Sequence, residues 1–400
     1  MQVLIPTRIL IRVIKNKATA FFVMKSEGQQ LKEVARLFSR LGFTAFGGPA
    51  VHIALMQDEV VKKKQWMSDQ HFLDLIGATN LIPGPNSTEM AIHIGQERAG
   101  WKGLMVAGLC FILPAVCITG IFAWLYKSYG ALPQVQPFIY GIKPAILSVV
   151  ISAIYPLAKK SLKTIQLGII GLFALVLCLF HYNEIYILFG AGLFAMLLSM
   201  AKSRNTGNGF LFFPVTFLQT TPASILSVNN TKLFLIFLKI GAILYGSGYV
   251  LFAFLDSELV SRGLLTHTQL IDAIAVGQFT PGPVFSSVTF VGYQINGITG
   301  AIVSTIGVFL PSFLFVALLN PLVKRMRGSV LFSVFLDAVN IASIALILAI
   351  CYEMGQESIT GWKPICIAVA SLVIGFGFRK INSAWIVLGG SLAGYLLTFI

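Results

Sequence analysis

Two Pro-Gly-Pro segments surrounded by neutral polar side chains are the residues of this sequence best suited to bind a small anion. The segments are Pro83–Pro85 and Pro281–Pro283. The side chains predicted to bind a substrate are Asn86 and Ser87 beside the first segment, and Gln278, Thr280 and Ser286 beside the second. Amides and hydroxyls donate hydrogen bonds without carrying charge, so they suit an oxyanion whose own charge need not be fully cancelled. Each hydroxyl could instead bond back to its own helix, and that alternative stays open.

Each Pro-Gly-Pro segment is predicted to interrupt a helix. Proline lacks an N–H and disfavours helical geometry in the residue before it, but it suits the first turn of a new helix. The apolar stretches on either side of the first segment hold only about a dozen residues. As helices they rise about 20 Å, which is too short to cross a hydrocarbon core of about 30 Å. We therefore expect re-entrant hairpins from Asp69 to Glu97 and from Thr266 to Tyr293, with a simple kink in a long helix as the alternative.

The second helix of each hairpin would begin with free N–H groups and the positive end of its dipole, both of which favour an anion. Gly84 and Gly282 would let the anion approach the backbone closely. Two other glycine-rich segments are expected to be unwound and to face the tips, and they hold the candidate site residues Gly47, Gly48, Gly246 and Ser247. His52 follows the first of them and could either donate to the anion or cap the broken helix.

Glu89 and His93 are the candidate proton-relay residues. They are four positions apart, so they share one face of the second hairpin helix. An acid beside a histidine inside a membrane suits proton transfer, and a purely structural hydrogen bond is the alternative. No third ligand has helical spacing nearby, so we predict no metal site and no cofactor.

The elements that must position these residues occur twice. Gly95, Gly100, Gly103 and Pro114 recur 197 residues later as Gly292, Gly297, Gly300 and Pro311. We expect these glycines to lie at turns and close helix contacts, and we give them no chemical role. The duplication divides the chain into a basic tail (1–30), a first repeat (31–202), a linker (203–230) and a second repeat (231–400).

The composition is that of a membrane protein. Hydrophobic residues make up 56% of the chain and charged residues 11%, whereas a soluble domain carries about 25% charged residues. Apolar runs long enough to cross a lipid bilayer recur along the sequence, so we predict an all-α polytopic protein of the cytoplasmic (inner) membrane. The net charge of +14 lies in the tail and short loops. The preference of cytoplasmic loops for basic residues explains this, so we predict no nucleic-acid partner.

Loop charges predict that the two repeats are inverted. The second loop of the first repeat holds Lys159 and Lys160, whereas the equivalent loop of the second repeat holds Glu353 and Glu357. Basic loops face the cytoplasm, so equivalent loops face opposite sides. We predict about five transmembrane helices per repeat, each repeat with its re-entrant hairpin, and a cytoplasmic linker.

One detail resists this scheme. The first crossing is expected around Leu41 to Met56, yet Lys62, Lys63 and Lys64 follow it and the tail before it is also basic. Either the tail is translocated despite its charge, or this segment crosses the membrane incompletely.

With these residues in view, the chain resembles the chromate ion transporter (CHR) family in its long two-repeat form. The matching stretches are Phe46–Pro49 with His52 and Glu59, Leu81–Glu89, Gly277–Val284 and Phe309–Phe313. Ser247 departs from the glycine-rich triplet of that family's second repeat. The resemblance implies efflux of chromate, with sulfate as a structural mimic.

Charge favours export of such an anion. Moving one charge through 100 mV is worth about 2.3 kcal/mol, so expelling a dianion from a negative interior is favoured by about twice that. We predict a secondary transporter that exports chromate, driven by the membrane potential, by protons or by both. A sulfate or other anion carrier and a passive anion channel are the alternatives. We do not expect an enzyme, because no nucleophile–base–acid set is visible, and the sequence leaves a homo-oligomer open.

Overall fold

The computed structural model describes residues 27–46, 48–202, 229–245, 248–326, 329–378 and 381–398, and these residues form helices without strands. The first repeat holds α2 (Glu27–Thr44), α3 (Gly48–Gln57), η1 (Asp58–Lys63), α4 (Asp69–Thr79), α5 (Asn86–Tyr129), α6 (Gln136–Ser161), α7 (Ile165–Leu179) and α8 (Glu184–Lys202). The second holds α9 (Asn230–Ile243), α10 (Val250–Leu255), η2 (Asp256–Val260), α11 (His267–Phe279), η3 (Val284–Ser286), α12 (Ser287–Met326), α13 (Val330–Ser358), α14 (Trp362–Gly377) and α15 (Ser383–Leu397).

Several predicted features lie outside the described residues. These are the basic tail up to residue 26, the linker from 203 to 228, and the candidate site residues Gly47, Gly246 and Ser247.

Five of the described segments are long and apolar enough to cross a membrane: Asn86–Tyr129, Gln136–Ser161, Glu184–Ala201, Val284–Leu318 and Val330–Ser358. Three shorter apolar helices, α7, α14 and α15, lie beside them. Large apolar side chains on the outer surface form stripes with helical spacing, such as Trp101, Met105 and Leu109 on α5, which are 62%, 47% and 43% exposed. Such a surface suits lipid rather than water, so the chain is a multi-pass α-helical membrane protein, as predicted.

The segment that was expected to cross the membrane first, Leu41 to Met56, instead folds back on itself. Arg40 near the end of α2 forms an ion pair with Glu59 in η1, and Phe38 shares a buried cluster with Val60. In one straight helix the Cα atoms of Arg40 and Glu59 would lie about 28 Å apart. The prediction of a single crossing is therefore wrong, and the alternative of an incomplete crossing is confirmed. Both ends of this α2–α3 hairpin lie on one side, which explains why both are basic.

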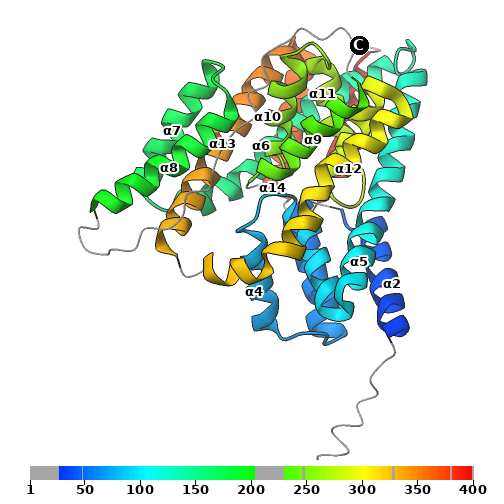
Figure 1. Ribbon diagram of the computed structural model, residues 1–400. Coiled ribbons are helices and arrows are strands. Elements are labelled where there is room, and N and C mark those ends of the chain that lie inside the picture. The colour runs from blue at the N-terminus through cyan, green and yellow to red at the C-terminus, as the bar shows by residue number, and fades with distance from the viewer. Residues whose placement is uncertain are drawn as a thin grey trace, which may run out of the picture.

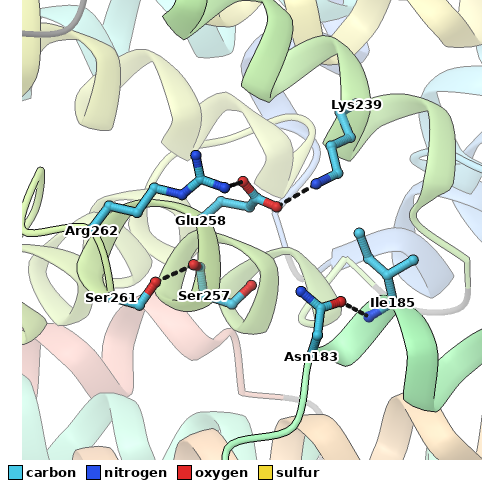
Figure 2. Close-up of polar contacts among 7 residues, drawn as sticks. All are labelled: Asn183, Ile185, Lys239, Ser257, Glu258, Ser261 and Arg262. Carbon is cyan, nitrogen blue, oxygen red and sulfur yellow. Dashed lines mark hydrogen bonds and ion pairs between the residues drawn. The ribbon is translucent and has the colours of Figure 1, made fainter. Parts of the chain in front are cut away.

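The second repeat builds the same hairpin from α9 and α10. The Glu258 carboxylate accepts hydrogen bonds from Lys239 Nζ at 2.6 Å and from Arg262 at 2.7 Å, and its side chain is only 4% exposed (Figure 2). Lys239 and Glu258 stand 199 positions after Arg40 and Glu59. The same ion pair therefore closes the base of the hairpin in both repeats.

A sharp reversal divides α5 into a short arm and a long arm. Ala99 and Gly100 leave helical geometry, and Gly100 has a φ of +58°. Beyond the reversal the arms run side by side, so closely that a Cβ on Gly103 would lie 2.1 Å from the carbonyl oxygen of Gly95. The same reversal occurs in α12, where the corresponding residues are Asn296, Gly297, Gly292 and Gly300. The predicted role of these glycines at turns and close contacts is confirmed.

The two repeats are inverted, as predicted. The outer end of the first hairpin, formed by α4 and the short arm of α5, adjoins the start of the long arm of α5. The opposite end of that long arm contacts the outer end of the second hairpin: Lys127 Nζ lies 3.5 Å from the carbonyl oxygen of Gln294, and Gln294 Nε2 donates to the carbonyl of Ala123 at 3.2 Å. Accordingly α4 and α11 lie at opposite ends of the molecule (Figure 1).

Each Pro-Gly-Pro segment docks on a helix break of the other repeat. We call residues 80–85 the first tip and residues 280–283 the second tip. The Gly84 N–H in the first tip donates to the Leu244 carbonyl, at the end of α9, at 2.8 Å. The Gly282 N–H in the second tip donates to the Ala45 carbonyl, at the end of α2, at 2.8 Å. The two bonds are equivalent under the repeat, and together they join the halves at the centre of the fold.

We expect Gly84→Ala and Gly282→Ala to destabilise the protein by about 1–3 kcal/mol each, because both residues have positive φ. Gly84 has a φ of +136° and its new Cβ would lie 2.2 Å from Glu89; Gly282 has a φ of +88° and its Cβ would lie 2.9 Å from that of Ala115. Gly120→Ala is the control, since its Cβ would meet nothing closer than 4.0 Å. Thermal unfolding in detergent measures the difference, and equal melting temperatures for Gly84→Ala and Gly120→Ala contradict it.

We also expect single cysteines at Lys64 and Lys160 to resist an impermeant maleimide in intact cells, while a cysteine at Ala131 is labelled. Lys64 follows η1 and Lys160 lies in the last turn of α6, both among basic residues, which prefer the cytoplasmic side, and Ala131 lies in the loop between α5 and α6. The parent chain measures the background from its five native cysteines. Strong outside labelling at Lys64 would show that the α2–α3 hairpin does not return to the side on which it began.

Candidate anion-binding site

The candidate site lies where four interruptions of the helices meet. The first tip contacts the break after α9, and the second tip contacts the break after α2, through the two backbone bonds described above. The break after α9 also approaches the start of the second short arm, because a Cβ on Gly248 would lie 3.6 Å from Phe285. Helices α3, α5 and α10 and the α12 arm all begin at these interruptions. The positive ends of their dipoles therefore converge on one region, which favours an anion there.

At the first tip, two of the predicted groups already have partners within the protein. The Gly84 N–H is bonded to Leu244, and Asn86 Nδ2 donates to Asn80 Oδ1 at 2.9 Å, closing the tip. Ser87 is buried at the start of α5 with 2% of its surface exposed. The first N–H groups of a helix have no partner within it, so the N–H groups of Asn86 and Ser87 are the donors that α5 itself offers.

At the second tip, the predicted hydroxyls and the amide behave differently. Thr280 Oγ1 lies 3.5 Å from the Gly277 carbonyl, so the alternative of back-bonding is the one observed. Ser286 Oγ accepts from Thr119 Oγ1 of α5 at 3.2 Å. Gln278 is 5% exposed, and its side chain interacts with that of Tyr249, although its Nε2 makes no hydrogen bond of regular geometry. Gln278 is therefore a buried amide whose donor could turn from Tyr249 to a ligand.

Glu89 is fully buried behind the first tip. Its Oε1 accepts from Ser312 Oγ of α12 at 3.3 Å, and its Oε2 has no partner. No described residue forms an ion pair with it, and Tyr245 lies within electrostatic range. A charged carboxylate buried without a cation is costly. His93, the other predicted relay residue, is buried one turn further along α5 with 2% of its surface exposed.

His52 caps a break instead of pointing its Nε2 at a ligand. That nitrogen lies 3.1 Å from the Ala45 carbonyl oxygen, the same oxygen that accepts from Gly282. The ring packs edge-on against Phe111 with the centroids 5.6 Å apart. The capping alternative is thus the one observed. Gly48 begins α3 beside it with a φ of +80°.

Buried polar atoms without a regular hydrogen bond occur beside both tips. They are Thr88 Oγ1 and Glu89 Oε2 beside the first tip, and Gln278 Nε2 and Ser287 Oγ beside the second. Buried polar groups in folded proteins are nearly always hydrogen-bonded to protein, water or ligand. These atoms are therefore candidates to bind a small polar ligand or water. Across the described residues, no group of His, Cys, Asp or Glu side chains has the arrangement to hold a metal ion.

Some groups at the tips were not among the site residues predicted from the sequence. Ser287 and Ser312 were not among the predicted site residues. Ser312 directly follows Pro311, which is repeated in both halves, and this position could have marked it as a candidate. The carbonyl acceptors of Ala45 and Leu244 have no signal in residue type, because every residue has a carbonyl.

Comparison with known proteins agrees with this architecture. The sequence matches the family model described as "Chromate transporter" twice, over residues 32–196 and 231–395. It is 26% identical over 375 residues to a probable chromate transport protein of Synechococcus elongatus, covering 92% of this chain and 95% of the relative. It is 28% identical over 370 residues to a chromate transport protein of Cupriavidus metallidurans, covering 91% of this chain and 92% of the relative. No solved structure matches the chain. The two matches span both repeats, and the chain belongs to the chromate transporter family.

Proposed function

We infer that this protein is a secondary transporter that exports chromate across the cytoplasmic membrane, with sulfate binding as a mimic. The observation that carries this is the set of buried donors without a regular hydrogen bond beside the tips, where four helices begin. A tetrahedral oxyanion would be held there by Gln278 Nε2, by Ser287 and Thr88, and by the first N–H groups of α5 and the α12 arm. The relatives named chromate transport proteins support the choice of anion.

The reciprocal docking of the tips supports a carrier over a channel. The bonds from Gly84 to Leu244 and from Gly282 to Ala45 each close a tip onto the opposite repeat. Because the repeats are inverted, opening one contact would expose the central region to one side and opening the other would expose it to the opposite side. A passive anion channel would need both contacts open together. A carrier for sulfate or another anion is the alternative, and the competition assay below separates it from a chromate exporter.

Glu89 is the group best placed to couple protons to transport. Among the described residues it is the buried acid that follows the first tip, and the equivalent position of the second repeat, 197 residues later, holds Ser286. Taking up a proton would remove the cost of its buried charge, and releasing the proton would require a path or a cation nearby. Proton entry in exchange for the dianion would add to the membrane potential as a driving force for export.

We expect Gln278→Ala to raise the half-saturating chromate concentration about 10- to 150-fold, since a hydrogen bond to a charged group contributes about 1.5–3 kcal/mol. Chromate flux into inverted membrane vesicles, with sulfate as competitor, measures the effect. Asn86→Ala should also weaken transport, because it removes the bond to Asn80 that closes the first tip. Gln356→Ala is the control, an exposed glutamine that bonds Tyr352 at the far end of α13. The site is wrong if Asn86→Ala and Gln278→Ala, expressed at normal levels, both transport like the parent.

We expect Glu89→Gln to keep chromate binding while flattening the pH dependence of flux, because the amide retains the contact to Ser312 but cannot exchange a proton. Glu97→Gln, on the same arm with a side chain 42% exposed, should keep the parental pH profile. If Glu89→Gln flux follows the parental profile, the proton role is lost while the anion site stands.

A further inference from the structure

A cleft of about 540 Å³ lies beside the α2–α3 hairpin, away from the tips. Its charged lining consists of Lys32, Glu33, Arg36, Arg40 and Lys64, and we call it the basic cleft. Lys32, Arg36 and Arg40 are spaced by four residues along α2, so they lie on one face of that helix. Like charges at this spacing repel one another and destabilise a helix, so the row needs a compensating interaction.

The protein itself compensates only part of this charge. Arg40 is paired with Glu59, and Glu33 is used by Arg98 at 2.9 Å. Lys32 and Arg36 have no ion-pair or hydrogen-bond partner among the described residues. Lys64 lies over the Trp66 ring, 5.7 Å from its centroid, which leaves its charge uncancelled. Among the described residues, the cleft therefore holds three cations without an acidic partner, Lys32, Arg36 and Lys64.

The fold does not require these three cations. The residue 199 positions after Arg40 is Lys239, which forms the equivalent ion pair with Glu258 at the base of the second hairpin. The equivalents of Lys32, Arg36 and Lys64 are Thr231, Leu235 and Gly263. The second hairpin thus forms with the same geometry but without the basic row, so the row serves something that the first repeat alone contacts.

The basic cleft lies at the level of a membrane surface. Lys102 Nζ pairs with Glu27 at 3.0 Å, which holds the start of α2 beside the start of the long arm of α5. Trp101, the neighbour of Lys102, is 62% exposed on that arm, and exposed tryptophans of membrane proteins gather at the headgroup level. The excess of basic residues in the nearby loop places this end in the cytoplasm, where the leaflet carries anionic lipid.

We propose that the basic cleft binds the phosphate group of an anionic lipid in the cytoplasmic leaflet. The Arg36 guanidinium offers paired donors that match phosphate oxygens, and Lys32 and Lys64 add point charges from either side. A free phosphate ion has the same chemistry, so the test compares the two sources. The proposal is independent of the anion site at the tips.

The experiment measures binding of phosphatidic acid, phosphatidylcholine and inorganic phosphate to the purified full-length protein in detergent, by native mass spectrometry and by thermal shift. The test variant is Lys32→Gln with Arg36→Gln. The control is Lys159→Gln with Lys160→Gln, which removes the same charge from the last turn of α6. Each basic residue near an anionic surface contributes about fivefold to binding, so the test variant should bind phosphatidic acid about 30-fold more weakly.

Loss of phosphatidic acid binding in the test variant, with binding kept in the control and no effect of phosphatidylcholine, supports the lipid site. Protection by inorganic phosphate at the same concentration would assign the cleft to a free oxyanion and overturn the lipid source. Equal weakening of both variants would show that binding follows net charge alone and would overturn the cleft as a site. Melting temperatures without lipid check that both variants are folded, and chromate flux should be unchanged in the control.

Discussion

The structure depends on two reciprocal backbone hydrogen bonds, from Gly84 to Leu244 and from Gly282 to Ala45. A helix that is broken inside a membrane exposes N–H and carbonyl groups that lipid cannot satisfy. Here each repeat supplies the partner for the broken backbone of the other. Neither half can therefore complete its own centre, and the four helix starts that favour an anion are held together by the same bonds that satisfy the breaks.

The inverted repeats share a backbone but not a set of side chains. Glu89 and Ser312 face each other behind the first tip, whereas Ser286 and Ala115 occupy the equivalent positions behind the second. The second hairpin is in turn tied to α5 by the Tyr126 hydroxyl, which donates to Asp272 at 2.6 Å. A symmetric scaffold with unequal polar groups gives the two sides of the membrane different chemistry at equivalent contacts.

The ion pairs at the hairpin bases have a separate role. Glu59 and Glu258 each form ion pairs with cations from both helical arms of their hairpin. The charged residues thus lie toward the open end of each hairpin, and its turn is apolar. Since α2 and α3 return to the side on which they began, basic residues can flank both without violating the preference of the cytoplasm for positive charge. The first hairpin then carries an excess of cations beyond its structural pair, and this excess forms the basic cleft.

The sequence by itself determined the class, the duplication, the inversion and the helix breaks. These follow from local or compositional rules: proline cannot donate a hydrogen bond, glycine permits the reversals at Gly100 and Gly297, and loop charges report the side of the membrane. Only the tertiary structure decided that α2 and α3 fold back instead of crossing the membrane. An apolar segment of that length has the same sequence pattern whether it crosses the membrane or folds back. It also decided that the His52 ring caps the Ala45 carbonyl, and that the N–H groups of Gly84 and Gly282 donate hydrogen bonds to the opposite repeat. The bonds from Gly84 to Leu244 and from Gly282 to Ala45 join residues more than a hundred positions apart, and the Arg40–Glu59 and His52–Ala45 contacts form only once the chain reverses after α2, so no local pattern encodes them.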